Sequence, residues 1–214
     1  MNLVQKIKYL KEIPNKEELN ELTAKLPENI QVCQEILKLV NKEGVSIEKN
    51  KIEDSSTSLY LVLNNKILIG NMKQNFTRIQ TIAHECIHSI QNRNKLLFHY
   101  FFANIVQIWF VLSFALCVFI KQEVITWSIF ASFVLTSLVL FFVRYSLEKD
   151  AMLRAKDLAK RYMEQDRTLN KEEIQKITEE YTKMNEIGVP LYRDCLFGKM
   201  LWKIVLLLMV VTLL

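Results

Sequence analysis

Two long stretches of this sequence contain no Lys, Arg, Asp or Glu, and only three residues separate them. The first stretch covers residues 96–120 and the second covers residues 124–143. A helix of about 20 apolar residues is long enough to cross the hydrocarbon layer of a bilayer. Because the linker is so short, the two stretches predict a tight antiparallel transmembrane hairpin over residues 96–143.

A third apolar stretch covers residues 196–214, and it is interrupted by Lys199 and Lys203. Lysines that extend to the lipid headgroups would let this stretch cross the bilayer, and an interfacial helix is the alternative. The composition is 50% hydrophobic and 24% charged, and such a chain must keep its charged residues in segments separate from its apolar ones. The chain therefore divides into polar parts at 1–95 and 144–195, the hairpin at 96–143, and a C-terminal hydrophobic helix at 196–214.

The basic residues predict how these segments are oriented. Most lysines and arginines near the apolar stretches lie in residues 1–95 and 144–195, whereas only Lys121 lies on the other side. By the positive-inside rule we expect an integral protein of the cell membrane, with both polar parts in the cytoplasm. We expect no cleaved signal peptide, since the N-terminus lacks an apolar core, and reduced thiols, since the four cysteines form no CxxC pair.

The net charge of +5 fits a membrane surface better than a nucleic acid, because the sequence contains no basic stripe with interleaved aromatic residues. Hydrophobic periodicity predicts helices over residues 15–43, with Asn15 as N-cap and Gly44 just past the end. Two short strands are predicted in residues 58–70, around a tight turn at Asn64-Asn65. The fold class is therefore mainly α, with a small β-hairpin.

Three further helices are predicted in the polar parts. One runs from about Thr77 to Asn92 and continues, with or without a kink, into the first apolar stretch. A second continues directly from the second apolar stretch. A third begins at Asn170, whose side chain forms a capping box with Glu173, and Gly188 ends it. The expected buried faces of the last two comprise Leu147, Ala151, Leu158 and Tyr162, and Ile174, Ile177, Tyr181 and Met184.

The helix over residues 77–92 carries the motif His84-Glu85-Cys86-Ile87-His88. The two histidines lie one helical turn apart, about 6 Å along the axis, so their imidazoles can bind one zinc ion. Glu85 lies about 100° around the helix and can accept a proton from a water that zinc activates. Such a motif has only three fixed positions and recurs by chance, so a third ligand is required to support a metal site.

Topology selects Glu148 as the third ligand. His99 lies about 16 Å beyond His88 along a straight helix, too far to share its metal. His88 is about 12 Å from the start of the first apolar stretch, and Glu148 is about 8 Å past the end of the second. A tight hairpin therefore places His88 and Glu148 at similar heights on the same side of the membrane. Asp150 is a candidate acceptor for a ligand imidazole, and both acidic residues are otherwise ordinary exposed charges.

These segments resemble the membrane-bound neutral zinc metallopeptidases of the YugP-like group, which are gluzincins. The family pattern A-H-E-x-G-H-A-x-Q is matched at residues 83–85, His88 and Gln91, and a later E-x-D-A-x-x-R-A is matched at residues 148–155. The resemblance covers roughly Glu28 to Met200. It implies a cytosolic zincin-like domain, one zinc ion per chain, the ligands His84, His88 and Glu148, and Glu85 as catalytic acid/base.

The sequence departs from the family pattern at two positions. Ile87 and Ser89 replace the usual glycine and alanine, and the larger side chain of Ile87 puts the size of the substrate in question more than metal binding. Either "LYLVL" or "KILIG" could offer a strand edge to an extended substrate, or both could belong to an ordinary hairpin. Cys86 is interpreted as a packing residue rather than a nucleophile. Three tyrosines are candidate oxyanion donors: Tyr145, Tyr181 and Tyr192.

The sequence therefore predicts a membrane-anchored zinc metalloendopeptidase that hydrolyses peptides or membrane-proximal protein segments at the cytoplasmic face. The first alternative is a non-catalytic membrane scaffold with a structural or relic zinc site, which has no need of Glu85. A small transport subunit is a second alternative. Substrate specificity and oligomeric state leave no signal in the sequence.

Overall fold

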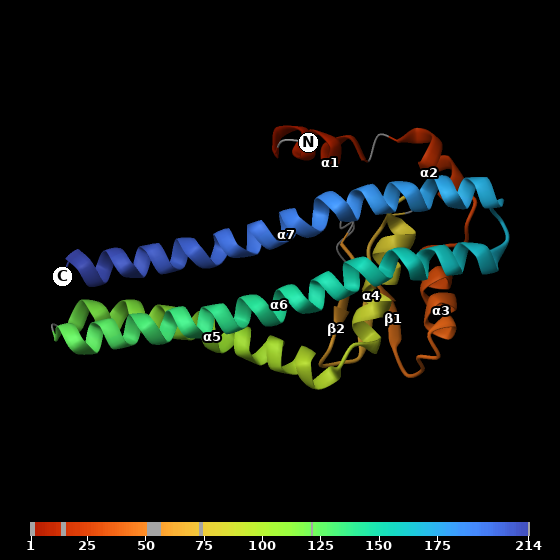
Figure 1. The fold of residues 1–214 in the computed structure, drawn as a ribbon. Coiled ribbons are helices and arrows are strands. Elements are labelled where there is room, and N and C mark those ends of the chain that lie inside the picture. The colour runs from red at the N-terminus through yellow and green to blue at the C-terminus, as the bar shows by residue number, and fades with distance from the viewer. Residues whose placement is uncertain (1–2, 14–15, 51–56, 73–74, 121, 214) are drawn as a thin grey trace. The chain divides into compact units, whose positions relative to one another are not determined.

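The computed structural model describes residues 3–13, 16–50, 57–72, 75–120 and 122–213. The protein is mainly helical and contains a small three-stranded sheet (Figure 1). The chain forms two compact units. Unit 1 comprises residues 1–93 and 149–189, and unit 2 comprises residues 94–148 and 190–214.

The N-terminal part of unit 1 holds short elements, and the remainder of the chain forms three long helices. The short helices are α1 (Leu3–Glu12), α2 (Glu17–Ala24), α3 (Asn29–Leu39) and α4 (Arg78–Ile90). The strands are β1 (Ser46–Lys49), β2 (Leu59–Leu61) and β3 (Lys66–Ile69). The long helices are α5 (Arg93–Phe119), α6 (Glu123–Asp166) and α7 (Lys171–Leu213).

The prediction that Gly188 ends a helix is wrong, because α7 continues without interruption through Gly188 and Pro190. Gly188 lies against the Met152 side chain, so it serves close packing rather than a left-handed cap. Pro190 removes one backbone donor, and a long apolar run after it sustains the helix. The C-terminal hydrophobic segment is thus the second half of α7. The start of α7 follows the prediction, since Asn170 and Glu173 form a reciprocal capping box at 2.8 and 2.9 Å.

The predicted end of α3 at Gly44 is also wrong. The helix ends at Leu39, and Asn41 adopts the left-handed conformation with φ 51°. The Lys42 N–H donates to Leu37 O at 2.9 Å and the Asn41 N–H donates to Lys38 O at 3.0 Å, which is a Schellman motif. Gly44, with φ 72°, instead turns the chain into β1. Asn15, the predicted N-cap, lies outside the described residues, and α2 begins after Lys16.

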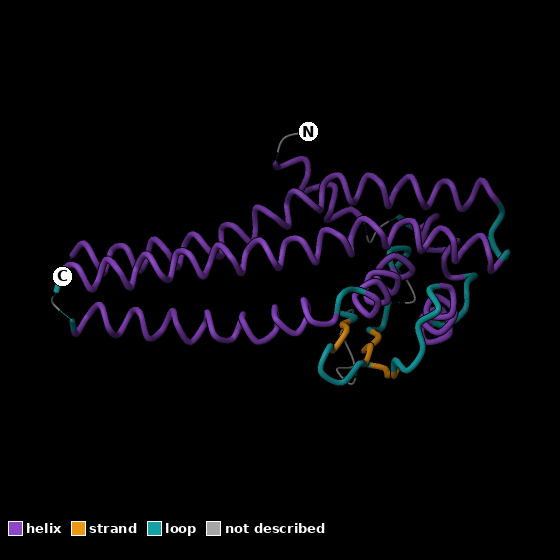
Figure 2. Tube along the Cα trace, turned by 60° about the horizontal axis from the view of Figure 1, so that its bottom comes forward, coloured by secondary structure: helices purple, strands orange, loops and turns teal. Residues whose placement is uncertain are grey.

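The predicted hairpin is present, and a further strand extends it. β2 pairs antiparallel with β3, and Asn65 between them has φ 48°. β1, which the sequence did not predict, pairs parallel with β3 from Ser46↔Lys66 to Lys49↔Ile69. The strand order β1-β3-β2 makes β3 the central strand and β2 an edge. The sheet lies beside α4, and β2 and β3 both contact this helix (Figure 2).

Unit 1 has one hydrophobic core, built by α2, α3, α4, the sheet and the polar segments of α6 and α7. Most of the predicted faces of α6 and α7 belong to it, with Ala151, Tyr162, Ile177 and Tyr181 buried, whereas Leu147 is buried in unit 2. The guanidinium of Arg78 is fully buried, and its two terminal nitrogens make four hydrogen bonds at 2.7–2.9 Å to the end of α2, the following turn and the start of α3. The Gln80 amide donates to Asn185, and the Asn185 amide donates to Met152 O, which ties α4 to α7 and α6.

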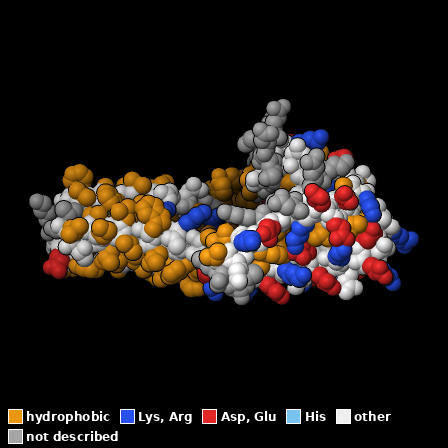
Figure 3. Space-filling model, turned by 90° about the horizontal axis from the view of Figure 1, so that it is seen from above, with side chains coloured by type: hydrophobic (Ala, Val, Ile, Leu, Met, Phe, Trp, Pro, Cys, Tyr) orange, Lys and Arg blue, Asp and Glu red, His pale blue; other side chains and the backbone are white. Residues whose placement is uncertain are grey.

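Unit 2 contains the apolar segments of α5, α6 and α7, which run side by side (Figures 1 and 2). Its core is small and comprises Val106, Cys117, Phe133 and Leu207 with their apolar neighbours. Many large apolar side chains are exposed around it, for example Ile108 at 60% and Leu135 at 64%. Figure 3 shows such side chains gathered over the apolar segments. Within the described chain, three helices are long and apolar enough to cross a membrane.

Candidate metal centre

Helix α4 positions the two motif histidines by burying the opposite face. Ile79, Ile82, Ala83 and Cys86 are fully buried in the core of unit 1. Because these positions recur at helical spacing, His84 and His88 fall together on the remaining face, where both are half-buried. The motif therefore presents two imidazoles from one rigid element.

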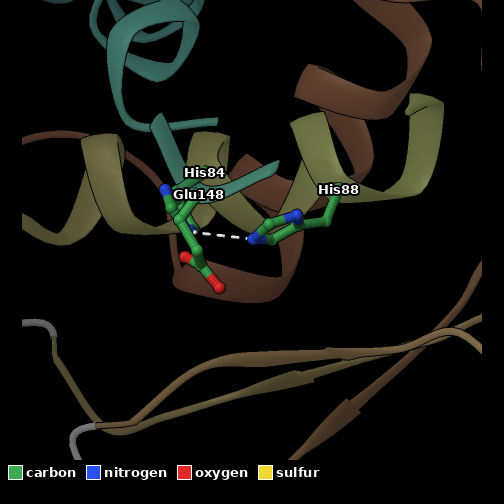
Figure 4. Close-up of side chains that lie close together, drawn as sticks. All are labelled: His84, His88 and Glu148. Atoms are coloured by element: carbon green, nitrogen blue, oxygen red, sulfur yellow. Dashed lines mark hydrogen bonds between the residues drawn. The ribbon is translucent and has the colours of Figure 1, made fainter. Parts of the chain in front are cut away.

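The two imidazoles converge on a carboxylate. The Nε2 atoms of His84 and His88 are 3.0 Å apart, and the rings meet edge to face at 86°. Glu148 of α6 completes the cluster, and one ligand atom from each of the three residues lies within 4.8 Å of the others. Figure 4 shows the three side chains directed toward a common point. Glu148 directly precedes Lys149, with which the unit 1 segment of the same uninterrupted helix begins.

The cluster fits a zinc ion. Ligand atoms about 2.1 Å from zinc in a tetrahedron lie about 3.4 Å apart. The two Nε2 atoms are already close to that separation, and the carboxylate would move inward by at most about 1.5 Å. Two imidazoles and one carboxylate leave a fourth position for water or substrate, which is the arrangement typical of catalytic zinc.

A relay of hydrogen bonds fixes the tautomer of His88. The Asp150 carboxylate can only accept, so the Gln91 Nε2 donates to its Oδ2 at 2.8 Å. The Gln91 Oε1 therefore faces the Nδ1 of His88 at 2.9 Å, and this nitrogen must carry the proton. The Nε2 of His88 is then left with its lone pair, as a metal ligand requires. Arg154 donates to the same Asp150 oxygen at 3.2 Å and holds the carboxylate in place.

Asp150 was expected to accept a hydrogen bond from a ligand imidazole, and it reaches His88 only through Gln91. Gln91 is the residue whose role the motif reasoning missed, although the family pattern includes it. It adopts an extended conformation with ψ 164° at the C-cap of α4, where the chain breaks before α5 begins. Because α4 ends here and does not continue into α5, the Gln91 side chain turns back toward His88.

Glu85 is 6% exposed and lies beside the edge strand. The backbone N–H of Tyr60 in β2 donates to Glu85 Oε2 at 2.6 Å. Since β3 is the central strand, "KILIG" offers no edge, and β2 remains the candidate surface for an extended peptide. The catalytic candidate and the edge strand are therefore directly connected.

The three candidate oxyanion tyrosines differ sharply. Tyr181 is fully buried and its hydroxyl donates to Phe76 O at 2.7 Å, so it is a core residue and unable to reach a substrate. Tyr192 is half-buried and its hydroxyl accepts from Arg144 Nε at 3.2 Å. Burial and the nearby Glu148 carboxylate raise its pKa, so the hydroxyl keeps its proton. Tyr145 stacks on Phe141. Of the three hydroxyls, that of Tyr192 therefore lies near Glu148, a candidate metal ligand.

The remaining candidate residues, Cys86 and His99, are not part of the cluster of potential metal ligands. Cys86 is fully buried with its Sγ 3.7 Å from that of Cys33, and burial raises its pKa well above the usual value. It is therefore a protonated packing residue. His99 lies in α5 and is absent from the cluster of potential ligands that the described residues form.

Comparison of the chain with protein-family models, with curated proteins and with solved structures gives no match.

Proposed function

We propose that this protein is a membrane-anchored zinc metallopeptidase, of the gluzincin kind that its two motifs resemble. His84, His88 and Glu148 would hold one zinc ion, and Glu85 would act as general acid/base. The observation that carries the proposal is the close approach of two imidazoles and one carboxylate, whose potential ligand atoms all lie within 4.8 Å of one another, with the tautomer of His88 fixed by Gln91. Chance HExxH sequences have no reason to acquire both features.

The residues of the chain suit peptide hydrolysis. Zinc, when bound, supplies Lewis acidity to a water molecule and to a scissile carbonyl. The Glu85 carboxylate would take the proton of the attacking water and return it to the leaving nitrogen. The Tyr60 N–H holds Glu85 in position for both transfers. Tyr192 would donate a hydrogen bond to the oxyanion, because its hydroxyl is protonated and lies near Glu148.

The edge strand and the apolar helices support the choice of substrate. An extended peptide could lie along the outer edge of β2, where the Tyr60 N–H donates to Glu85. Three apolar helices would anchor the protein in the cell membrane, with residues 1–95 and 144–195 on the cytoplasmic side. We therefore propose peptides or membrane-proximal protein segments as substrates. The alternative is a non-catalytic scaffold with a structural or relic zinc site.

Metal analysis and hydrolysis together test the proposal. Purified wild-type protein is expected to bind one zinc ion, whereas His84→Ala and Glu148→Ala should lose it. Glu85→Gln should keep the zinc and lower the hydrolysis of a fluorogenic peptide library by about 10²–10⁴-fold. Glu164→Gln, an exposed glutamate of α6, is the matched control and should behave as wild type.

Two results would contradict the proposal. Equal zinc content in wild type and in Glu148→Ala would show that the Glu148 carboxylate is not a zinc ligand. Zinc binding without any hydrolysis by the wild type, or hydrolysis that Glu85→Gln leaves unchanged, would favour the scaffold.

A further inference from the structure

Unit 2 contains a pocket of about 170 Å³ between its apolar helices. Three cationic side chains line it, Arg144 from α6 and Lys199 and Lys203 from α7. The remaining wall is mostly apolar and includes Val106, Phe141 and Leu196. Basic residues gathered within an otherwise apolar bundle require an explanation, because charge is costly there.

None of the three cations has a carboxylate partner among the described residues. Arg144 donates only to the Tyr192 hydroxyl, at 3.2 Å. Lys203 donates to Gln107 Oε1 at 2.5 Å and lies 5.4 Å from the centre of the Phe110 ring. Lys199 makes no hydrogen bond or ion pair within the described chain. Arg144 therefore shares the Tyr192 hydroxyl with Glu148, whereas the two pocket lysines have no anionic partner among the described residues.

The position of Lys203 makes this charge significant. Gln107, its partner, lies about 16 Å along α5 from the start of the apolar stretch, well inside a hydrocarbon layer about 30 Å thick. A lysine that merely extended to the headgroups would point toward the charged end of the helix. Lys203 instead contacts Gln107 and is only half-exposed. An ionisable residue held inside the bundle is the expected mark of a binding site.

We propose that this pocket binds the phosphate headgroup of an anionic phospholipid. The phosphodiester anion would lie among Arg144, Lys199 and Lys203 and supply the negative charge that the pocket lacks. Its acyl chains would lie along the apolar wall and the exposed side chains beside it, such as Phe142 and Leu201. A free phosphate could satisfy the cations but would leave the apolar wall without a partner. The proposal assumes that these helices cross a bilayer, and it does not depend on peptidase activity.

Lipid binding by the full chain tests the proposal. The purified protein in a neutral detergent is mixed with phosphatidylglycerol, phosphatidylcholine or inorganic phosphate, and bound lipid is counted by native mass spectrometry. We expect wild type to bind phosphatidylglycerol at least about tenfold more tightly than phosphatidylcholine, and inorganic phosphate to compete weakly. The double variant Lys199→Gln/Lys203→Gln should lose this preference.

Two further variants make the result interpretable. Lys199→Arg/Lys203→Arg should keep the preference, because it keeps both charges. Lys156→Gln/Lys160→Gln removes two lysines spaced one turn apart in unit 1 and should also keep it. A preference that survives in Lys199→Gln/Lys203→Gln would overturn the proposal. So would competition by inorganic phosphate at the affinity of the lipid, which would assign the pocket to a free anion.

The lipid site and the metal site can fail independently. Glu85→Gln is expected to bind phosphatidylglycerol as wild type does, since this residue lies in unit 1. An active, zinc-loaded peptidase without lipid preference would refute the lipid site alone, and an inactive protein with full lipid preference would refute the peptidase alone.

Discussion

Unit 1 and unit 2 differ in the hydrogen-bond partners of their buried and half-buried basic side chains. In unit 1 the guanidinium of Arg78 is completely buried, and four hydrogen bonds to nearby oxygen atoms compensate it. In unit 2 Arg144, Lys199 and Lys203 line a pocket, and no carboxylate of the described chain pairs with them. The two terminal nitrogens of Arg78 thus have four oxygen partners within unit 1, although its Nε has none, whereas the pocket cations of unit 2 have few partners among the described residues.

The apolar surfaces of the two units differ in the same direction. Unit 1 buries its large apolar residues in one continuous core, as water requires. Unit 2 has a small core and leaves many large apolar side chains exposed. This difference is compatible with a chain that meets water at unit 1 and lipid at unit 2, and the hydrogen bonds of Gln91 and Asp150 in unit 1 orient the candidate ligand His88.

The largest effect should come from breaking the polar network of unit 1. Arg78→Met leaves buried acceptors without donors, each costing about 1–3 kcal/mol, and should destabilise unit 1 by about 4 kcal/mol or more. Hydrogen exchange followed by mass spectrometry would show faster exchange in α3 and α4 but not in the apolar part of α5. Arg161→Met, at an exposed position of α6, should change little. Uniform destabilisation of both units would contradict the division between them.

A matched pair of leucines compares the two cores directly. Leu158→Ala in unit 1 should cost about 2–5 kcal/mol, because it opens a cavity in a core that water surrounds. Leu207→Ala in unit 2 should cost about 1 kcal/mol, because lipid chains are as apolar as leucine and only packing is lost. Unfolding in lipid vesicles, measured for both variants, tests the difference. Equal costs would show that both cores face the same solvent.

Asp150→Ala should weaken zinc binding by about 10- to 100-fold, because it releases Gln91 and with it the orientation of His88. Competition with a coloured chelator measures this affinity. Asp157→Ala removes a carboxylate that pairs only with Lys156 at 3.6 Å, and it should leave the affinity unchanged. Identical affinities in the two variants would show that the relay through Gln91 has no part in metal binding.

The smallest effect should follow from Asn170→Ala, which removes the N-cap of α7. The loss is expected to be about 1 kcal/mol and confined to unit 1. Thermal unfolding would record it, with Gln175→Ala as a control on an exposed face of the same helix. A larger loss that also affected unit 2 would indicate that the start of α7 stabilises the whole helix.

Part of the fold could be predicted from local pattern. The capping box at Asn170, the hairpin around Asn65 and the buried faces of α6 and α7 all follow from residues close together in sequence. The errors arose where a local signal was ambiguous. The sequence pattern favours a helix end at both Gly188 and Gly44, but Gly188 packs on Met152 inside a helix and Gly44 lies in a turn. Strand β1 carries too few residues for a period to be visible.

Part of the candidate site could likewise be predicted from the sequence, and part could not. The histidine pair and Glu85 could be recognised from spacing alone, and the short link between the apolar stretches was enough to suggest Glu148. The hydrogen-bond relay from Arg154 through Asp150 and Gln91 to His88 could not be recognised from the sequence, because it depends on the end of helix α4 at Gln91.

The sequence by itself determined most of the helical segments, which of them are apolar enough for a membrane, and which side chains α4 presents together, because helical periodicity and hydrophobicity are local properties. Only the tertiary structure decided that Gln91 fixes the tautomer of His88, that β2 is an edge strand bonded to Glu85, and that three cations share one apolar pocket. These features depend on contacts between residues far apart in the chain, and packing rather than local propensity selects those contacts.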